Sequence, residues 1–142
     1  MSVELYASAP PNVVAFVIAW LLPLHLPGSD GAHIGPRRID EDPLPYTMVT
    51  RVPGDDDQLY WDDGIVSVHH FDVDYESASD GADVDHQRML LLKYTDQTVT
   101  MSDGSLANCD YLKVLQKPVR IDFEQETIQR FVARYQIGLG YV

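Results

Sequence analysis

The segment Gly64 to Ser77, GIVSVHHFDVDYES, concentrates more potential metal ligands than any other part of the chain. Two histidines, two aspartates and a glutamate lie within eight residues. Imidazole and carboxylate groups suit Zn, Mn or Fe, and His70, Asp72 and Asp74 would share one face of a strand. Such side chains are about 6.5 to 7 Å apart, too far for three of them to reach one ion without other ligands. We therefore interpret the segment as a strand with a polar face. A small metal-dependent hydrolase that uses these three residues is the alternative.

The alternation of residues in this segment predicts two faces, one directed to the core and one to solvent or a protein partner. The expected core set is Ile65, Ser67, His69, Phe71, Val73 and Tyr75. The expected outward set is Val66, Val68, His70, Asp72, Asp74 and Glu76.

No other pattern points to catalysis or to a cofactor. The acidic run Asp55–Asp57, with Asp62 and Asp63, lacks the spaced acids and final glutamate of a calcium loop. The glycines match neither a phosphate-binding loop nor a dinucleotide-binding loop. Cys109, the single cysteine, has Asn and Asp as neighbours, which do not favour a thiolate. A triad of distant residues stays open, but we predict no catalytic residue, no metal and no cofactor, and the protein is not expected to be an enzyme.

The composition indicates a globular protein with an acidic surface. The 142 residues fit one domain, and 45% of them are hydrophobic and 23% charged. The net charge of -12 disfavours a nucleic-acid reader and binding to anionic membranes. As far as Leu112 there are 19 acidic and five basic residues, whereas Lys113 to Val142 holds five basic and three acidic residues. In a self-associating protein, this basic end could meet the acidic part of the next subunit.

The N-terminal sequence MSVELYASAPP lacks the basic region and cleavage motif of a signal peptide. The apolar run Val13 to Leu22 has about half the length of a membrane helix. We expect a protein of a reducing compartment that does not enter a membrane.

Two helices are predicted. Ser8 can cap the first, which should run from about Pro11 to Leu22. The second is expected from about Gly81 to Thr95, with Asp80 as its N-cap and the segment MLLL in its buried stripe.

Strands are expected at residues 46–54, 64–77, 98–101, 110–116, 117–124 and 127–142. A connector rich in Pro and Gly covers about residues 23–45, with at most one short strand around Ala32 to Arg37, and residues 55–64 form a hairpin tip. In the last strand, the expected core face is Phe131, Ala133, Tyr135, Ile137 and Leu139. The predicted fold class is α+β, a mainly antiparallel sheet with two helices packed on one face.

Several segments, taken in order, resemble one family of proteins. They are the apolar helix PNVVAFVIAWLLPL, the proline-rich connector, the strand LPYTMVTRVPG, the acidic tip, the strand IVSVHHFDVDYES, the second helix and the closing RFVARYQIGL. This series is similar to the tail-terminator (minor tail) proteins of long-tailed phages that infect actinobacteria. The resemblance covers about Pro11 to Leu139 and rests on order and spacing, with VTRVPG and RFVARYQIGL as its most telling segments. The large acid excess and the His69–His70 pair depart from it.

The resemblance implies a structural virion protein that forms a six-membered ring, caps the tail tube and offers a surface for joining the head. The implied partners are other copies of the chain, the major tail tube protein and a head-completion or connector protein. DNA would pass through the channel without sequence-specific binding. The implied location is the virion, at the head-to-tail junction, after assembly in the host cytoplasm.

The interface residues are hypotheses. Tyr60 and Trp61 in the tip are candidate aromatic anchors. Two arginines of the last strand are expected to pair with acids of a neighbouring subunit; these are Arg130 and Arg134 on one side, and Asp72, Asp74 and Glu76 on the other. The alternative is another neck component. Long central helices would favour a connector, and an almost helix-free barrel would favour a head-closure protein.

Overall fold

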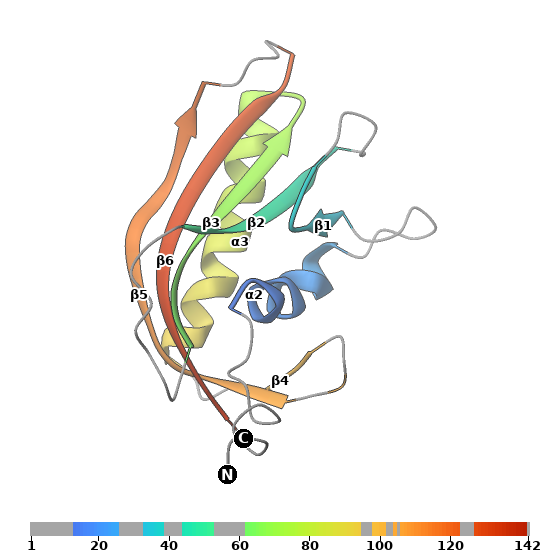
Figure 1. Cartoon of the computed structure of the whole chain (residues 1–142). Coiled ribbons are helices and arrows are strands. Elements are labelled where there is room, and N and C mark those ends of the chain that lie inside the picture. The colour runs from blue at the N-terminus through green and yellow to red at the C-terminus, as the bar shows by residue number, and fades with distance from the viewer. Residues whose placement is uncertain are drawn as a thin grey trace.

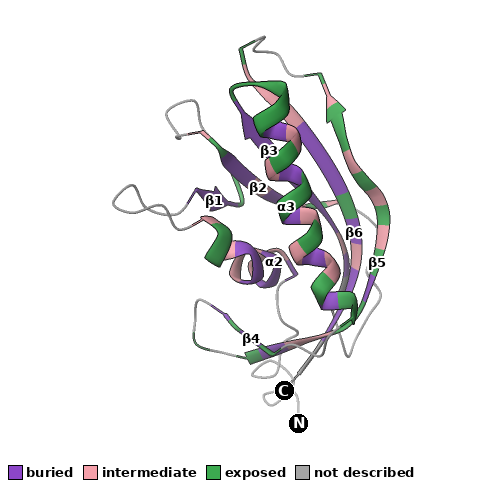
Figure 2. Cartoon of the chain, turned by 180° about the vertical axis from the view of Figure 1, so that it is seen from behind, coloured by how far each residue is buried: buried purple, intermediate pink, exposed green. Residues whose placement is uncertain are grey.

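The two helices that the structure describes lie on the same side of one six-stranded sheet (Figures 1 and 2). The computed structural model describes residues 13–25, 33–38, 44–52, 62–94, 98–101, 104, 106–122 and 127–141. The elements are α2 (Val13–Leu21), the 3-10 helix η1 (Leu22–His25), β1 (Ile34–Gly35), β2 (Tyr46–Val52), β3 (Asp62–Asp72), α3 (Tyr75–Tyr94), β4 (Thr98–Thr100), β5 (Leu106–Ile121) and β6 (Gln129–Tyr141). The predicted α+β class is confirmed.

The strand order of the sheet is β1-β2-β3-β6-β5-β4. Only β1 and β2 are parallel, and all other neighbours are antiparallel. The two central strands pair along their length, from Asp62 opposite Leu139 to Asp72 opposite Gln129. The short strand predicted in the connector is β1.

Helix α2 packs against the sheet through one face. Its buried residues follow the spacing of a helical stripe and are Val13, Phe16, Val17, Trp20 and Leu21. They join a core cluster with apolar side chains of β3, β6 and α3, among them Val66, Tyr135 and Met89. Fully burying each large apolar side chain contributes about 1.5 to 3 kcal/mol. The predicted first helix is confirmed over the residues that the structure describes.

Helix α3 begins at Tyr75, so the predicted start at Gly81 and the predicted cap at Asp80 are wrong. The N-cap is Asp74. Its Oδ1 accepts a hydrogen bond of 2.8 Å from the Ser77 N–H, and its Oδ2 accepts one of 3.1 Å from the Ser77 hydroxyl. The turns before Gly81 were missed because their buried position is the small Ala78, which gives little hydrophobic signal.

The predicted faces of β3 are reversed. Val66, Val68 and His70 lie on the side of the helices, where the first two belong to the core cluster. Ser67, His69 and Phe71 lie on the opposite side, and these are also buried. Alternation separates two faces but cannot say which face is covered, because both sets contain apolar and polar residues. The strand also ends at Asp72, so Asp74 and Glu76 belong to the start of α3.

The predicted core face of β6 is confirmed, since Phe131, Ala133, Tyr135, Ile137 and Leu139 are all buried. Residues 110–116 and 117–124 were predicted as separate strands, but β5 runs without a break from Leu106 to Ile121. Register shifts interrupt its pairing with β6, and one of them, between Gln116 and Val119, accommodates Pro118. Gly104, in the predicted turn before β5, has a φ of 88°.

Candidate functional site

The three residues of the alternative metal site do not all lie on β3, because the strand ends at Asp72. His70 points toward α3, where its Nδ1 lies 3.3 Å from Asp85 Oδ2. Asp72, at the end of β3, accepts a hydrogen bond of 2.7 Å from the Val73 N–H, and Asp74 caps α3. Among the residues that the structure describes, no group of three or more His, Cys, Asp or Glu side chains is placed to hold a metal ion. The described residues therefore do not form the site that the hydrolase alternative requires.

The predicted interface residues have different surroundings. Glu76 and Asp74 are exposed at the start of α3, and Arg134 is exposed on β6. Asp72 is buried, with 8% of its surface exposed. Tyr60 and Trp61 lie outside the described residues. The proposed pairing of Arg134 with Asp74 or Glu76 of a neighbour stays a prediction, whereas Asp72 has little surface to offer.

Arg130 is held inside its own chain. Its Nε and Nη2 lie 3.2 and 2.8 Å from His69 Nδ1, so the guanidinium donates and the ring nitrogen accepts. The Cζ atom of Arg130 also lies 5.9 Å from the centre of the Phe71 ring, and Arg38 covers the same ring at 5.3 Å. Burial, with the charges of Arg130 and Arg134, lowers the pKa of His69 to about 4. His69 is therefore neutral at physiological pH.

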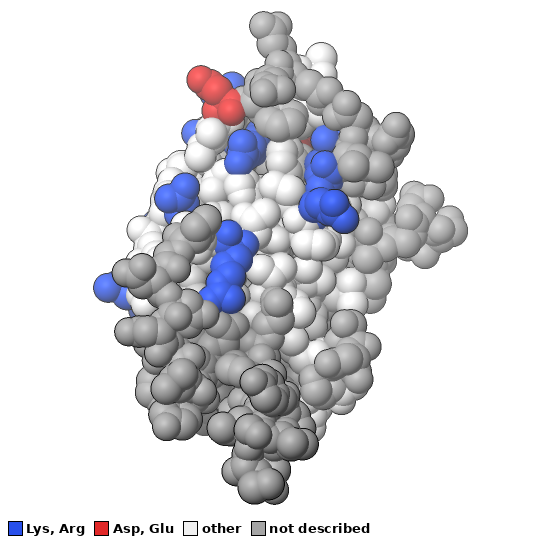
Figure 3. All heavy atoms as spheres, in the orientation of Figure 1, with Lys and Arg blue, Asp and Glu red and all other residues white. Residues whose placement is uncertain are grey.

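The side of the sheet away from the helices carries positive charge over β5 and β6. Residues paired across the two strands share a face, so the register defines this surface. We call it the outer β5–β6 surface; it consists of Lys113, Gln116, Val119, Ile121, Arg130, Arg134 and Gln136, whereas Val132 on the same face is buried. Three of these residues are basic and none is acidic. Figure 3 shows this side of the molecule, with Lys and Arg side chains spread over it and few acidic ones among the described residues.

Negatively charged side chains cluster at the beginning of helix α3. We call this cluster the acidic start of α3. It consists of Asp74, Glu76, Asp80 and Asp83, all of them exposed. No Lys or Arg occurs between Asp72 and Gln87. Carboxylates in the first turn of a helix interact favourably with its dipole, so this end can carry the charge at little cost to stability. Figure 2 shows this end of α3 with exposed residues facing away from the sheet.

A buried polar cluster joins four elements beneath α3. Asp85 Oδ1 lies 2.7 Å from His25 Nε2, and Asp85 Oδ2 accepts a hydrogen bond of 2.9 Å from the Thr47 hydroxyl. Thr47 Oγ1 is also 3.0 Å from His70 Nδ1. Because the single hydroxyl proton of Thr47 goes to Asp85, the Nδ1–H of His70 is the donor toward both Thr47 Oγ1 and Asp85 Oδ2, which lies 3.3 Å from Nδ1. The cluster therefore links η1, β2, β3 and α3.

The ionised state of Asp85 depends on these partners. Burial alone raises the pKa of its carboxyl group, but hydrogen bonds from His25 and His70, together with their charges, outweigh burial and bring the pKa down to about 2. Asp85 is thus a carboxylate at neutral pH although only 2% of its surface is exposed. An unpaired buried charge would cost several kcal/mol, so the two histidines are needed to keep it inside.

The far side of the His70 ring lies against α3. Within the described part of the chain, His70 Nε2 is buried and has no hydrogen-bond partner. Gly81 of α3 lies against this side of the His70 ring. A Cβ atom on Gly81 would overlap His70 Nε2 and lie 2.6 Å from His70 Cε1. The lack of a side chain at Gly81 lets α3 approach the ring.

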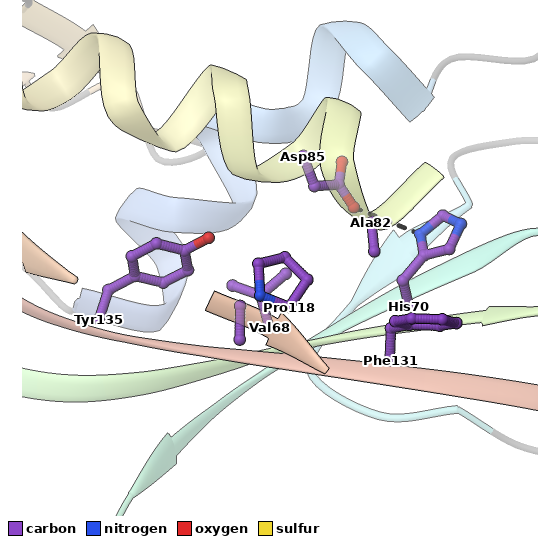
Figure 4. Close-up of a pocket in the computed structure, with 8 residues that line it drawn as sticks. Val68, His70, Ala82, Asp85, Pro118, Phe131 and Tyr135 are labelled. Atoms are coloured by element: carbon purple, nitrogen blue, oxygen red, sulfur yellow. Dashed lines mark ion pairs between the residues drawn. The ribbon is translucent and has the colours of Figure 1, made fainter. Parts of the chain in front are cut away.

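A small cavity of about 10 Å³ lies beside the cluster, which is room for about one water molecule. Figure 4 shows His70 and Asp85 at one side of it and Tyr135 at the other. The Tyr135 hydroxyl is 2.6 Å from His86 Nδ1, and burial followed by the nearby charge of Asp85 raises the pKa of Tyr135. A carboxylate bonded to an imidazole can serve in acid–base catalysis. A space of this size would admit no organic substrate, so we interpret the cluster as a polar cross-link of the fold.

Sequence reasoning missed this cluster. His25 and Asp85 are 60 residues apart, and Thr47 and Asp85 are 38 apart, so no local spacing connects them. The available signal was the position of Asp85 in α3. It occupies the buried stripe formed by Ala78, Ala82, Met89 and Leu92, where a charged residue requires a partner.

Cys109 has the properties of an unreactive thiol. Burial, followed by the charge of Asp110, raises its pKa to about 11. Its Sγ lies 3.2 Å from the carbonyl oxygen of Tyr111. A thiol in this state is a poor nucleophile at neutral pH.

None of the helices in the described part of the chain is both long and apolar enough to cross a membrane. Comparison of the sequence with protein-family models gives no match, and comparison with curated proteins gives none either.

Proposed function

We propose that the chain is a structural virion protein that forms a ring, expected to be a hexamer, which caps the tail tube and joins the tail to the head. The observation that carries the proposal is the separation of two unlike surfaces. The cationic outer β5–β6 surface and the acidic start of α3 lie on opposite sides of the sheet. A subunit with two different complementary surfaces suits head-to-tail contacts around a ring.

Strand β5 adds apolar contact area that suits a protein partner. Its exposed large apolar side chains are Leu106, Tyr111, Leu115 and Val119, each at least 40% exposed. Apolar side chains gathered on one strand, with charged residues beside them, are typical of a surface that binds another polypeptide. Strand β5 also has features that limit nonspecific pairing with strands of other proteins. These are its register shifts, Lys113 and Pro118.

Among neck proteins, the mixed architecture supports a terminator. The described chain is neither a set of long central helices, as a connector would be, nor an almost helix-free barrel, as a head-closure protein would be. It combines a six-stranded sheet with a helix of 20 residues, Tyr75–Tyr94.

The hydrolase alternative has little support from the geometry. His70 is 3% exposed, and the cavity beside it has room for about one water molecule. The two aspartates of that alternative are engaged with the backbone at the start of α3.

The partners in this proposal are other copies of the chain, the major tail tube protein and a head-completion or connector protein. The net charge of -12 would let DNA pass a ring of such subunits without binding to it. Tyr60 and Trp61 remain candidate anchors for a neighbouring ring.

Loss of the gene in a phage that encodes this chain tests the proposal. We expect lysates of an early-stop mutant to contain full heads and separate tails of irregular length, both visible by electron microscopy. Expression of the intact chain from a plasmid should restore joined particles. Joined particles of normal tail length in the mutant would contradict the proposal.

A further inference from the structure

Two surfaces of neighbouring subunits must meet in the proposed ring, and the fold offers one complementary pair. Resting on that proposed function, we infer that the outer β5–β6 surface of one copy receives the acidic start of α3 of the next copy. The occupant is therefore a second copy of this chain, bound head to tail.

The outer β5–β6 surface has positive charges that are not paired within the described residues. Of its three basic residues, Arg130 is committed to His69. Lys113 and Arg134 are exposed, and within the described residues neither lies within ion-pair distance of a carboxylate. Val119, 40% exposed on the same surface, adds an apolar contact. An occupant should thus be acidic, with at least one apolar side chain beside its acids.

The first half of α3 meets that description. Asp80 and Asp83 are exposed, and Val84 is adjacent to them with 49% of its surface exposed. Residues 80, 83 and 84 are neighbours on a helix surface because three or four residues make one turn. The nearest basic residue of α3, Arg88, is turned toward α2 and stacks on Trp20, with its Cζ atom 3.9 Å from the ring centre. Arg88 therefore does not neutralise the negative charge at the acidic start of α3.

The placement of the two surfaces determines the kind of assembly. They lie on opposite sides of the sheet, so one copy cannot use both in a contact with the same neighbour. Such a contact is heterologous and repeats from copy to copy, which closes a ring when the rotation per step allows. Opposite charges across the contact also raise the rate at which subunits meet and disfavour contacts between like surfaces.

A nucleic acid is the other class of molecule that a cationic surface could bind. The net charge of -12 opposes it, because the field of the whole molecule repels phosphate. The exposed apolar residue on the surface also favours a polypeptide. Binding of DNA by this surface would therefore overturn the inference.

Cross-linking between two variants tests the contact. In a Cys109→Ser background, one preparation carries Arg134→Cys and the other carries Asp80→Cys, and the two are mixed on purified tail tubes from the same phage and treated with a short bismaleimide. We expect a dimer that contains one chain of each kind, and at least about tenfold less dimer from either preparation alone. Lys93→Cys, at the other end of α3, replaces Asp80→Cys in the control and should give no mixed dimer with Arg134→Cys.

The result of this cross-linking separates the contact from the function on which it rests. Tube ends capped without the 134–80 mixed dimer, or with an equal yield of the 134–93 dimer, would overturn the inference and leave the function standing. Absence of protein from tube ends would count against the function itself.

Charge-reversal variants give a second, independent test of the contact between subunits. Arg134→Glu together with Lys113→Glu should reduce the occupancy of tube ends about tenfold or more at low salt, since each change replaces an attraction by a repulsion. Asp80→Lys together with Asp83→Lys in a partner preparation should restore occupancy in the mixture. Circular dichroism should be unchanged, because all four side chains are exposed. Loss of binding to duplex DNA in the first variant, with normal occupancy of tube ends, would assign the surface to nucleic acid instead.

Discussion

Gly81 and His70 meet where α3 crosses β3, and this contact is the most sensitive point of the buried cluster. A glycine inside an ordinary helix is less stable than alanine by about 1 kcal/mol, so Gly→Ala there usually stabilises. Here the new Cβ atom would overlap the His70 ring. We predict that Gly81→Ala lowers the free energy of unfolding by about 1 to 3 kcal/mol, as measured by urea denaturation.

The control for this prediction is the same substitution without the ring. In a His70→Ala background, Gly81→Ala should become neutral or stabilising, because the overlap is gone. A double-mutant cycle that gives additive effects would show that the contact does not constrain Gly81.

The pairing of His69 with Arg130 predicts a dependence of stability on pH. The folded-state pKa of His69 is about 4, below the usual value of 6.5, so the folded protein binds fewer protons than the unfolded chain between these values. Stability should therefore be complete above about pH 6.5 and fall as the pH decreases toward 4. We expect His69 to account for about 2 kcal/mol of this fall, a figure reduced because solvent partly screens the arginines.

His69→Gln tests this dependence, because glutamine keeps a polar side chain but does not titrate. Its unfolding free energy should change less than that of the wild type between pH 6.5 and 4. Arg130→Gln should move the histidine pKa, followed by NMR, back toward 6.5. An unchanged slope in His69→Gln would place the acid sensitivity elsewhere.

At the scale of elements, one reciprocal contact joins the two helices. Trp20 Nε1 donates to the carbonyl oxygen of Arg88 at 2.8 Å, and Arg88 Nε donates to the carbonyl oxygen of Trp20 at 3.0 Å. The guanidinium also stacks on the indole ring. Lysine keeps the charge but cannot reproduce the planar stacking.

We predict that Arg88→Lys lowers the free energy of unfolding by about 1 to 2 kcal/mol and the Tm by about 3 to 6 °C, measured by thermal denaturation. Arg134→Lys is the matched control, since Arg134 is exposed, and its Tm should stay within about 1 °C of the wild type. Equal effects of the two substitutions would mean that the stacked pair adds nothing to the contact between α2 and α3.

The elements could be predicted where the hydrophobic pattern is strong. The apolar run of α2 and the alternation of β6 gave the helix, the strand and its buried face. The pattern failed for α3, because its first turns contain Ser, Asp and Gly and its buried stripe includes Asp85. It failed for the facing of β3, because arginines on Phe71 bury the side that the helices leave open. Such coverage depends on residues distant in sequence.

At the scale of the whole molecule, the sequence showed an acidic chain with a basic end, but not where these charges would lie. The fold places Lys113 and Arg134 on the outer β5–β6 surface, and the acids of residues 74–83 on the other side of the sheet. The separation arises because Lys113 and Arg134 lie on the side of β5 and β6 that faces away from the helices, whereas α3 packs on the other side of the sheet (Figure 2). We propose that this separation allows copies of the chain to bind one another and close on a tail tube.

Electron microscopy of purified tail tubes incubated with the protein tests this claim most directly. We expect ring-shaped density with sixfold symmetry at one end of each tube, and tubes that no longer elongate when tube protein is added. Bare tube ends and continued elongation at a large excess of the folded protein would contradict it.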